Sequence, residues 1–187
     1  MKISVREMSL VAMFAGLTAV GAMVSIPFGE VPITMQTLFV ILSGLILGPK
    51  LGPLSQIVYV LLGLAGAPIF AGFTGGLQSI MAPSFGFIIS FIFVSYIAGL
   101  ISHCGKSSSK INIWIGSFVG TIVAYLIGLP YMYYILNIVM GKGLSFGTIL
   151  NMGCILFLPG DLFKFIIASV ATAKILPILK KSGLSLN

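Results

Sequence analysis

An acidic residue and a basic residue lie close together inside an apolar stretch of the chain. The stretch FLPGDLFKF covers residues 157–165 and places Asp161 three positions before Lys164. Side chains three positions apart lie on one face of a helix, so the carboxylate and the ammonium can pair. Ionisable residues within a membrane-spanning helix are costly and usually functional. We therefore expect the pair to offer a polar solute one acceptor and one cation; a purely structural ion pair near the membrane boundary is the alternative.

Uncharged polar residues gather in two segments that we expect on the same side of the membrane as this pair. The segment PFGEVPITMQT covers residues 27–37, and the glycine-rich segment FAGFTGGLQSIMAPSFG covers residues 70–86. Ligand pockets are mostly apolar with a few placed polar groups, and the aromatic side chains can wall such a site. Two flexible connections without a binding role are the alternative. The candidate ligand-binding residues of these segments are Thr34, Gln36, Phe73, Thr74, Gln78, Ser84 and Phe85.

Residue sets for catalysis or metal binding are missing from the sequence. The three acidic residues, Glu7, Glu30 and Asp161, lie in different predicted segments, and the single His103 is expected to be a solvated residue of a polar connection. Two cysteines with one histidine do not make a metal site, and no GxxxxGKS/T phosphate-binding loop occurs. The sequence therefore predicts neither an enzyme nor a cofactor, and it shows no basic patch for nucleic acid.

The elements that must position these residues are membrane helices. The chain is 58% hydrophobic and 7% charged, whereas soluble domains carry about 25% charged residues. We predict an all-α polytopic membrane protein with one domain, residues 1–187, built as a compact bundle of six transmembrane helices. The GPKLGP segment, residues 48–53, separates two short helices, and one bent span is the alternative there. The predicted helices are 7–27, 35–48, 51–66, 84–102, 111–138 and 150–178.

The basic residues predict the orientation of this bundle. With six spans and both termini in the cytoplasm, the outer connections hold only Lys142, and Lys164 lies near the outer end of the last span. Basic residues favour the cytoplasmic side, so the net charge of +7 reports topology in the cell membrane. The basic residues expected on the inner side are Lys2, Arg6, Lys50, Lys106, Lys110, Lys174, Lys180 and Lys181.

Small residues form a stripe along the first predicted helix. Ala12, Ala15, Gly16 and Ala19 lie within the stretch AMFAGLTAVGAM. Such a stripe lets two helices approach closely. It is expected to dock another membrane subunit, and packing within the chain is the alternative.

Four motifs together carry a resemblance to a known family. They are VPITMQT (31–37), LGPKLG (47–52), GLAGAPIFAGFTGG (63–76) and LPGDLFK (158–164). In this order and spacing they resemble the BioY family, the biotin-specific S components of energy-coupling-factor (ECF) transporters. The resemblance covers nearly the whole chain.

The resemblance implies a fold, a ligand and partners. It implies a six-helix membrane domain of a prokaryotic cell membrane that binds biotin with high affinity near its outer face. The connection between the first two helices would close the site. Uptake would require a transmembrane coupling subunit, facing Ala15 and Ala19, and two cytoplasmic ATPase subunits. Asp161 and Lys164 would line the biotin site.

The chemistry of biotin agrees with this assignment. An ionised aspartate only accepts hydrogen bonds and suits the ureido N–H groups, while Gln36, Gly75 and Gly76 would complete the polar contacts. After Gly76 the chain reads LQSIMAPSFGF, where the family is expected to be richer in glycine, so Gln78 and Ser84 are the candidates for the remaining contact. An S component for another small vitamin and a membrane scaffold are the alternatives.

Overall fold

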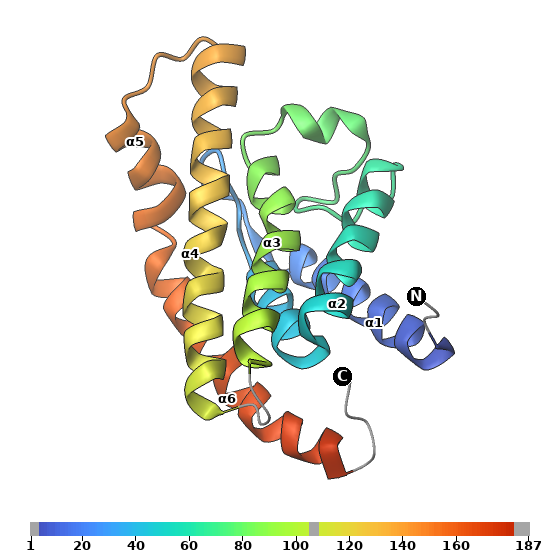
Figure 1. Ribbon diagram of the computed structural model, residues 1–187. Coiled ribbons are helices and arrows are strands. Elements are labelled where there is room, and N and C mark those ends of the chain that lie inside the picture. The colour runs from blue at the N-terminus through green and yellow to red at the C-terminus, as the bar shows by residue number, and fades with distance from the viewer. Residues whose placement is uncertain (1–3, 105–108, 182–187) are drawn as a thin grey trace.

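The protein is mostly helical in the computed structural model, which describes residues 4–104 and 109–181 (Figure 1). The long helices are α1 (Val5–Met23), α2 (Gln36–Leu64), α3 (Phe85–Ser102), α4 (Lys110–Tyr134) and α6 (Leu158–Lys181). The short elements are β1 (Ser25–Ile26), β2 (Ile33–Thr34), a 3₁₀ turn (Leu77–Met81), α5 (Phe146–Leu150) and two π-helical turns (Ile135–Val139 and Asn151–Ile155).

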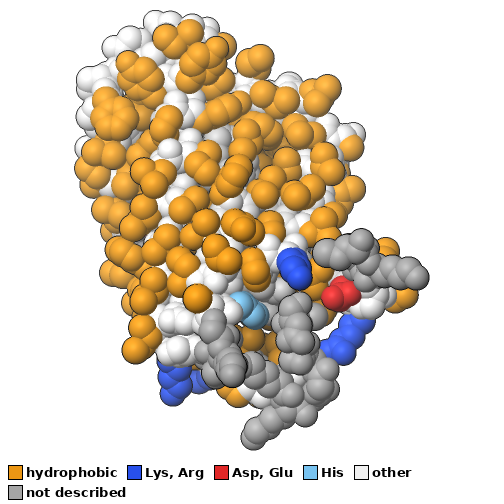
Figure 2. Space-filling view, in the orientation of Figure 1, with side chains coloured by type: hydrophobic (Ala, Val, Ile, Leu, Met, Phe, Trp, Pro, Cys, Tyr) orange, Lys and Arg blue, Asp and Glu red, His pale blue; other side chains and the backbone are white. Residues whose placement is uncertain are grey.

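Five helical segments of the described chain are long and apolar enough to cross a membrane. Figure 2 shows apolar side chains over most of the visible face, with lysine and arginine side chains gathered at its lower end. Lipid-facing helices need such surfaces, because the bilayer offers no partners to polar groups. The prediction of a mostly helical polytopic membrane protein is confirmed. The segments are Val5–Met23, Gln36–Leu64, Phe85–Ser102, Lys110–Val139 and Phe146–Leu179.

Helix α2 is a hairpin of two helical arms. Gly48 has φ 79° and ψ −177°, a conformation outside the helical region, and Pro49 follows it. The arms run antiparallel, since Gln36 Nε2 donates to the Tyr59 hydroxyl at 2.6 Å and Gln56 Nε2 donates to Ser43 Oγ at 3.1 Å. The break lies within the predicted segment 48–53. Because α2 counts as one candidate span by length, six separate spans stay a prediction.

Buried polar groups join this hairpin to its neighbours. Gln56 and Ser43 are fully buried, and Gln56 also accepts a hydrogen bond from Thr18 of α1 at 3.3 Å. Ser43 lies 2.8 Å from the Ser95 hydroxyl of α3. A Cβ at Gly44 would come within 2.2 Å of the Ser95 carbonyl oxygen, so only glycine permits this approach. Close backbone contact and internal hydrogen bonds together position α1 and α3 against α2.

The end of α3 closes the bend of α2. His103 Nε2 lies 3.0 Å from the Leu45 carbonyl oxygen, and the His103 ring lies beside Gly48. His103 is half-buried. The expectation of a solvated loop residue is therefore wrong, because the ring fills the space over the bend and finds a carbonyl partner there.

Two of the differences between the observed and the predicted helix boundaries have a clear structural reason. Helix α1 ends at Met23 rather than at residue 27, because Ser25–Ile26 pairs with Ile33–Thr34 as a small antiparallel hairpin. The predicted helix 150–178 is divided, with α5 beginning at Phe146 and α6 at Leu158. Pro159 fits the first turn of α6, where its missing N–H leaves no unmade helical bond.

The small-residue stripe of α1 faces two directions. Ala15 and Ala19 are 5% and 9% exposed and belong to the protein's own core, whereas Ala12 and Gly16 are exposed. In this structure α1 packs Ala15 and Ala19 against its own chain, and contact of these two residues with a partner stays a prediction. An interface at Ala12 and Gly16 stays a prediction.

Several helix ends that carry basic residues lie at one end of the molecule. Figure 1 shows the bend of α2, the end of α3, the start of α4 and the end of α6 at the lower end of the molecule. Lys50 and Lys110 belong to these regions. Lys2 and Lys106, predicted on the same side, lie outside the described residues.

Candidate ligand-binding site

A cavity of about 640 Å³ lies where the polar segments meet the helices. Its wall includes residues of β2, α2, α3, α4 and α6, together with the segment between α2 and α3. Small-molecule pockets have about 300–1,000 Å³ and a few placed polar groups on apolar walls. The size therefore suits a small organic ligand.

The Asp161–Lys164 ion pair lies in the wall of this cavity. Asp161 Oδ1 and Lys164 Nζ are 2.8 Å apart, and their side chains are only 11% and 7% exposed. Lys164 Nζ also donates to Thr37 Oγ1 at 3.1 Å, which joins α6 to α2. The pair is electrically neutral, and one of the three Lys164 N–H groups is left for a further acceptor.

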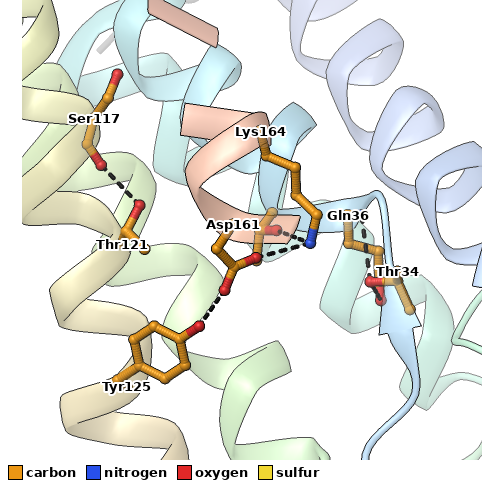
Figure 3. Close-up of polar contacts among 8 residues, drawn as sticks. Thr34, Gln36, Ser117, Thr121, Tyr125, Asp161 and Lys164 are labelled. Atoms are coloured by element: carbon orange, nitrogen blue, oxygen red, sulfur yellow. Dashed lines mark hydrogen bonds and ion pairs between the residues drawn. The ribbon is translucent and has the colours of Figure 1, made fainter. Parts of the chain in front are cut away.

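Tyr125 of α4 holds the other oxygen of the carboxylate. Its hydroxyl donates to Asp161 Oδ2, as Figure 3 shows. Its ring packs edge-on against Phe87, with ring centres 6.3 Å apart. Asp161 is thus oriented from α4 through Tyr125 and within α6 through Lys164, and each oxygen keeps acceptor capacity for a ligand.

The sequence analysis missed Tyr125, although a signal for it exists. Ser117, Thr121 and Tyr125 follow one another at intervals of four residues, so they share one face of α4. Figure 3 shows these side chains along α4, with Tyr125 directed toward Asp161. Thr121 and Tyr125 both line the cavity.

Gln36 is fixed at the beginning of α2. Its side-chain oxygen accepts a hydrogen bond from Thr34 Oγ1 at 3.1 Å, and its nitrogen donates to the Tyr59 hydroxyl. Gln36 is 4% exposed and lies on the cavity wall with Thr34. Hydrogen bonds therefore fix the orientation of both polar side chains at the cavity wall.

The segment between α2 and α3 contributes the exposed edge of the cavity. Phe70 and Thr74 pair across a tight turn in which Gly72 and Phe73 have positive φ angles of 73° and 57°. A bulky residue with positive φ is unusual and strained. Phe73 nevertheless lines the cavity with 65% of its surface exposed, so the turn holds an aromatic ring at the edge.

The cavity brings together all but two of the candidate ligand-binding residues. Gly76 instead donates its N–H to the Gly63 carbonyl at 2.7 Å, and Phe85 is 3% exposed and packs against Phe70. Neither lines the cavity, while contact of the others with a ligand stays a prediction. The candidates on the wall are Thr34, Gln36, Phe73, Thr74, Gly75, Gln78, Ser84, Asp161 and Lys164.

The apolar wall includes residues that the sequence analysis did not single out. Ile41 comes from the first half of α2, and Phe87 and Phe91 come from the first half of α3. They belong to nearly continuous apolar runs, so neither polarity nor spacing separates them from lipid-facing neighbours.

The hairpin between α1 and α2 reaches across to α4 and the residues that follow it. Val31 is 7% exposed and packs in one cluster with Leu129 and Ile149. Glu30 forms an ion pair with Lys142, which lies in the connection between α4 and α5. Val31 also lines the cavity, so this hairpin forms part of its cover.

The connection that carries Lys142 is itself fixed. The Lys142 N–H donates to the Leu136 carbonyl at 2.9 Å, and the Leu144 N–H donates to Asn137 Oδ1 at 2.6 Å. The Asn137 amide nitrogen returns a hydrogen bond to the Leu144 carbonyl at 2.9 Å. Lys142 therefore meets Glu30 from a preorganised backbone.

Comparisons with known proteins agree on one family. The model of the BioY family matches residues 1–181. A relative from Pyrococcus horikoshii, named probable biotin transporter BioY, is 41% identical over 159 residues, 85% of this chain and 89% of the relative. The biotin transporter BioY of Thermotoga maritima is 32% identical over 91% of this chain and 95% of its own.

A solved structure has the same arrangement of the chain. It is the crystal structure of the S-component for biotin from an ECF-type ABC transporter. The TM-score is 0.68, with 26% sequence identity over 91% of this chain and 90% of the other.

Proposed function

The chain belongs to the BioY family, and from this premise we propose that it captures biotin for uptake as the S component of an ECF transporter. The observation that carries the proposal is a cavity of suitable size whose wall holds a buried, neutral pair of Asp161 and Lys164. The chain is a transporter subunit and not an enzyme.

The pair complements one edge of the ureido ring. That ring presents an N–H group beside a carbonyl oxygen. Asp161 accepts from the N–H, and the remaining N–H of Lys164 donates to the carbonyl. Tyr125 and Thr37 support this reading, because they hold the two charged groups in place without ligand. The apolar bicycle and tail of biotin suit the aromatic and aliphatic wall.

The topology we propose has six spans with both termini in the cytoplasm. Support comes from the antiparallel arms of α2, which return the chain to the side from which it entered the bilayer. A single bent span would instead carry the chain across. Lys50 at the bend agrees with an excess of basic residues inside, and Lys142 at the opposite end is the exception.

The partners of the proposed transporter are a transmembrane coupling subunit and two cytoplasmic ATPase subunits. The chain contains no phosphate-binding loop of the GxxxxGKS/T type, so the energy must come from other subunits. Exposed Ala12 and Gly16 on α1 offer a small-residue surface that a partner helix can approach closely.

Biotin titration of the purified chain tests the proposal. We expect tight 1:1 binding by calorimetry and a loss of at least tenfold in Asp161→Asn, because the amide replaces one acceptor and leaves Lys164 buried without its counter-charge. Glu7→Gln is the matched control, since it makes the same chemical change at a residue that does not line the cavity. A folded wild-type chain that binds no biotin contradicts the proposal, and a screen of other vitamins follows.

A further inference from the structure

The charges on the cavity wall cancel. Among the described residues that line the cavity, Asp161 and Lys164 are the charged ones, and they neutralise each other at 2.8 Å. Lys142 is the other basic group near the cover of the cavity, but it pairs with Glu30 and does not line the wall. Biotin, however, carries a carboxylate at the end of its tail. Among the described residues of the wall, therefore, no basic side chain is left without a counter-charge to pair with this carboxylate.

Lys164 is a poor partner for that carboxylate. A ligand carboxylate at Lys164 would put a second negative charge beside Asp161, in a part of the wall where both side chains are nearly buried. Like charges at short range repel strongly where water is excluded. A neutral ureido edge beside Lys164 would leave the ion pair with Asp161 intact. It would also add a hydrogen bond to each of the two side chains.

Another edge of the cavity is exposed to solvent. Its exposed lining residues come from the segment between α2 and α3 and include Phe73, Thr74 and Gln78. A carboxylate at this edge keeps part of its hydration and meets neutral polar groups, which avoids the cost of burying an unpaired charge. The tail of the ligand is thus directed from the buried pair toward this edge.

We infer that the affinity of the site for biotin does not depend on the charge of the biotin carboxylate. Derivatives in which this carboxylate is neutral are then ligands too. The inference rests on the proposed function. The ligand class then includes biotin, its methyl ester and its primary amide, all of which share an intact ureido ring. The site then has two chemically different parts. The ion pair binds the ureido edge, and neutral groups contact the tail.

Competition binding on the full wild-type chain tests this. Labelled biotin is displaced by unlabelled biotin, biotin methyl ester or biotinamide at equilibrium. We expect the dissociation constants of both derivatives to lie within fivefold of that of biotin. A loss greater than fivefold for the two derivatives overturns the inference while leaving biotin capture intact. A chain that binds none of the three compounds overturns the proposed function and the inference with it.

A Lys164→Gln variant gives a second readout. The inference expects this variant to weaken biotin and biotin methyl ester by the same factor, because Lys164 contacts the ureido end that both share. If Lys164 instead paired with the carboxylate, the variant would weaken biotin alone and the ratio of the two affinities would change. A changed ratio of more than fivefold overturns the inference.

Discussion

At the scale of single residues, the site depends on how a buried carboxylate is oriented. Asp161 has one partner on each oxygen, Lys164 from its own helix and Tyr125 from α4. An uncompensated buried charge is expensive, whereas a paired and hydrogen-bonded one is tolerated. The contacts with Lys164 and Tyr125 stabilise the buried charge of Asp161. They also fix the direction of the acceptor positions that remain free on its carboxylate.

Removal of the Tyr125 hydroxyl should weaken biotin binding. Tyr125→Phe keeps the ring packed on Phe87 and deletes a hydrogen bond to a charged group, which contributes about 1.5–3 kcal/mol. We expect a loss of roughly 10- to 100-fold in affinity by calorimetry. Tyr131→Phe is the control on the same helix, because the Tyr131 hydroxyl donates to the Ile80 carbonyl and does not line the cavity.

The role of Tyr125 as a positioning residue can be separated from a structural one. If Tyr125 acts through Asp161, the Tyr125→Phe change should have little further effect on affinity in an Asp161→Asn background. Equal losses in both backgrounds would contradict this role.

At the scale of elements, the bend of α2 and the cover of the cavity are the decisive features. The bend brings Gln36 and Tyr59 together, so that the first residues of α2 are held at the cavity wall. The cover depends on a hairpin whose tip packs against residues more than a hundred positions later in the chain, through Val31 and Glu30. Both features are contacts between elements and not properties of one helix.

Gly48→Ala should destabilise the hairpin. Its φ of 79° with ψ of −177° is a combination that essentially only glycine adopts. We expect a loss of about 1–3 kcal/mol in the free energy of unfolding, measured by denaturant titration in detergent. Gly16→Ala is the control, because a Cβ at Gly16 meets no described atom within 4 Å. Equal stability of both variants would contradict the assigned conformation.

The Glu30–Lys142 pair should slow the release of biotin. The side chains are 28% and 40% exposed, and such a pair contributes about 0.2–1 kcal/mol. Glu30→Gln and Lys142→Gln should therefore each raise the dissociation rate by roughly two- to fivefold, measured by chasing labelled biotin. The reversed pair, Glu30→Lys with Lys142→Glu, should restore the slow rate. No change in the single variants would mean that the pair does not hold the cover.

At the scale of the whole molecule, the chain is a multi-pass membrane protein whose ligand cavity and basic end lie apart. The bend of α2 contacts His103 near the start of the α3–α4 connection, whereas Lys142 lies beyond the far end of α4. In the proposed topology these two regions are on opposite sides of the bilayer.

Labelling of single cysteines tests this topology. In a background with Cys104 and Cys154 replaced by serine, Lys142→Cys should react with a membrane-impermeant thiol reagent in intact cells. Lys50→Cys should react only after the cells are permeabilised. The reverse pattern would place the termini outside, and labelling of both sites in intact cells would contradict a bend that reaches the inner side.

The sequence by itself determined the class of protein, its family and the location of the charged pair. Long apolar runs require membrane helices, and a carboxylate with an ammonium three residues later is visible without a structure. The break at residues 48–53 was equally local, since glycine and proline act on their own backbone. These properties depend on composition or on neighbours in the chain.

Only the tertiary structure decided which faces meet. The partnership of Tyr125 with Asp161, the antiparallel arms of α2 and the burial of Ala15 and Ala19 are contacts between distant residues. In soluble proteins the polarity of a helix face predicts which side is buried. Membrane helices are apolar toward both lipid and core, so polarity does not mark the buried side, and close packing and hydrogen bonds between helices decide it.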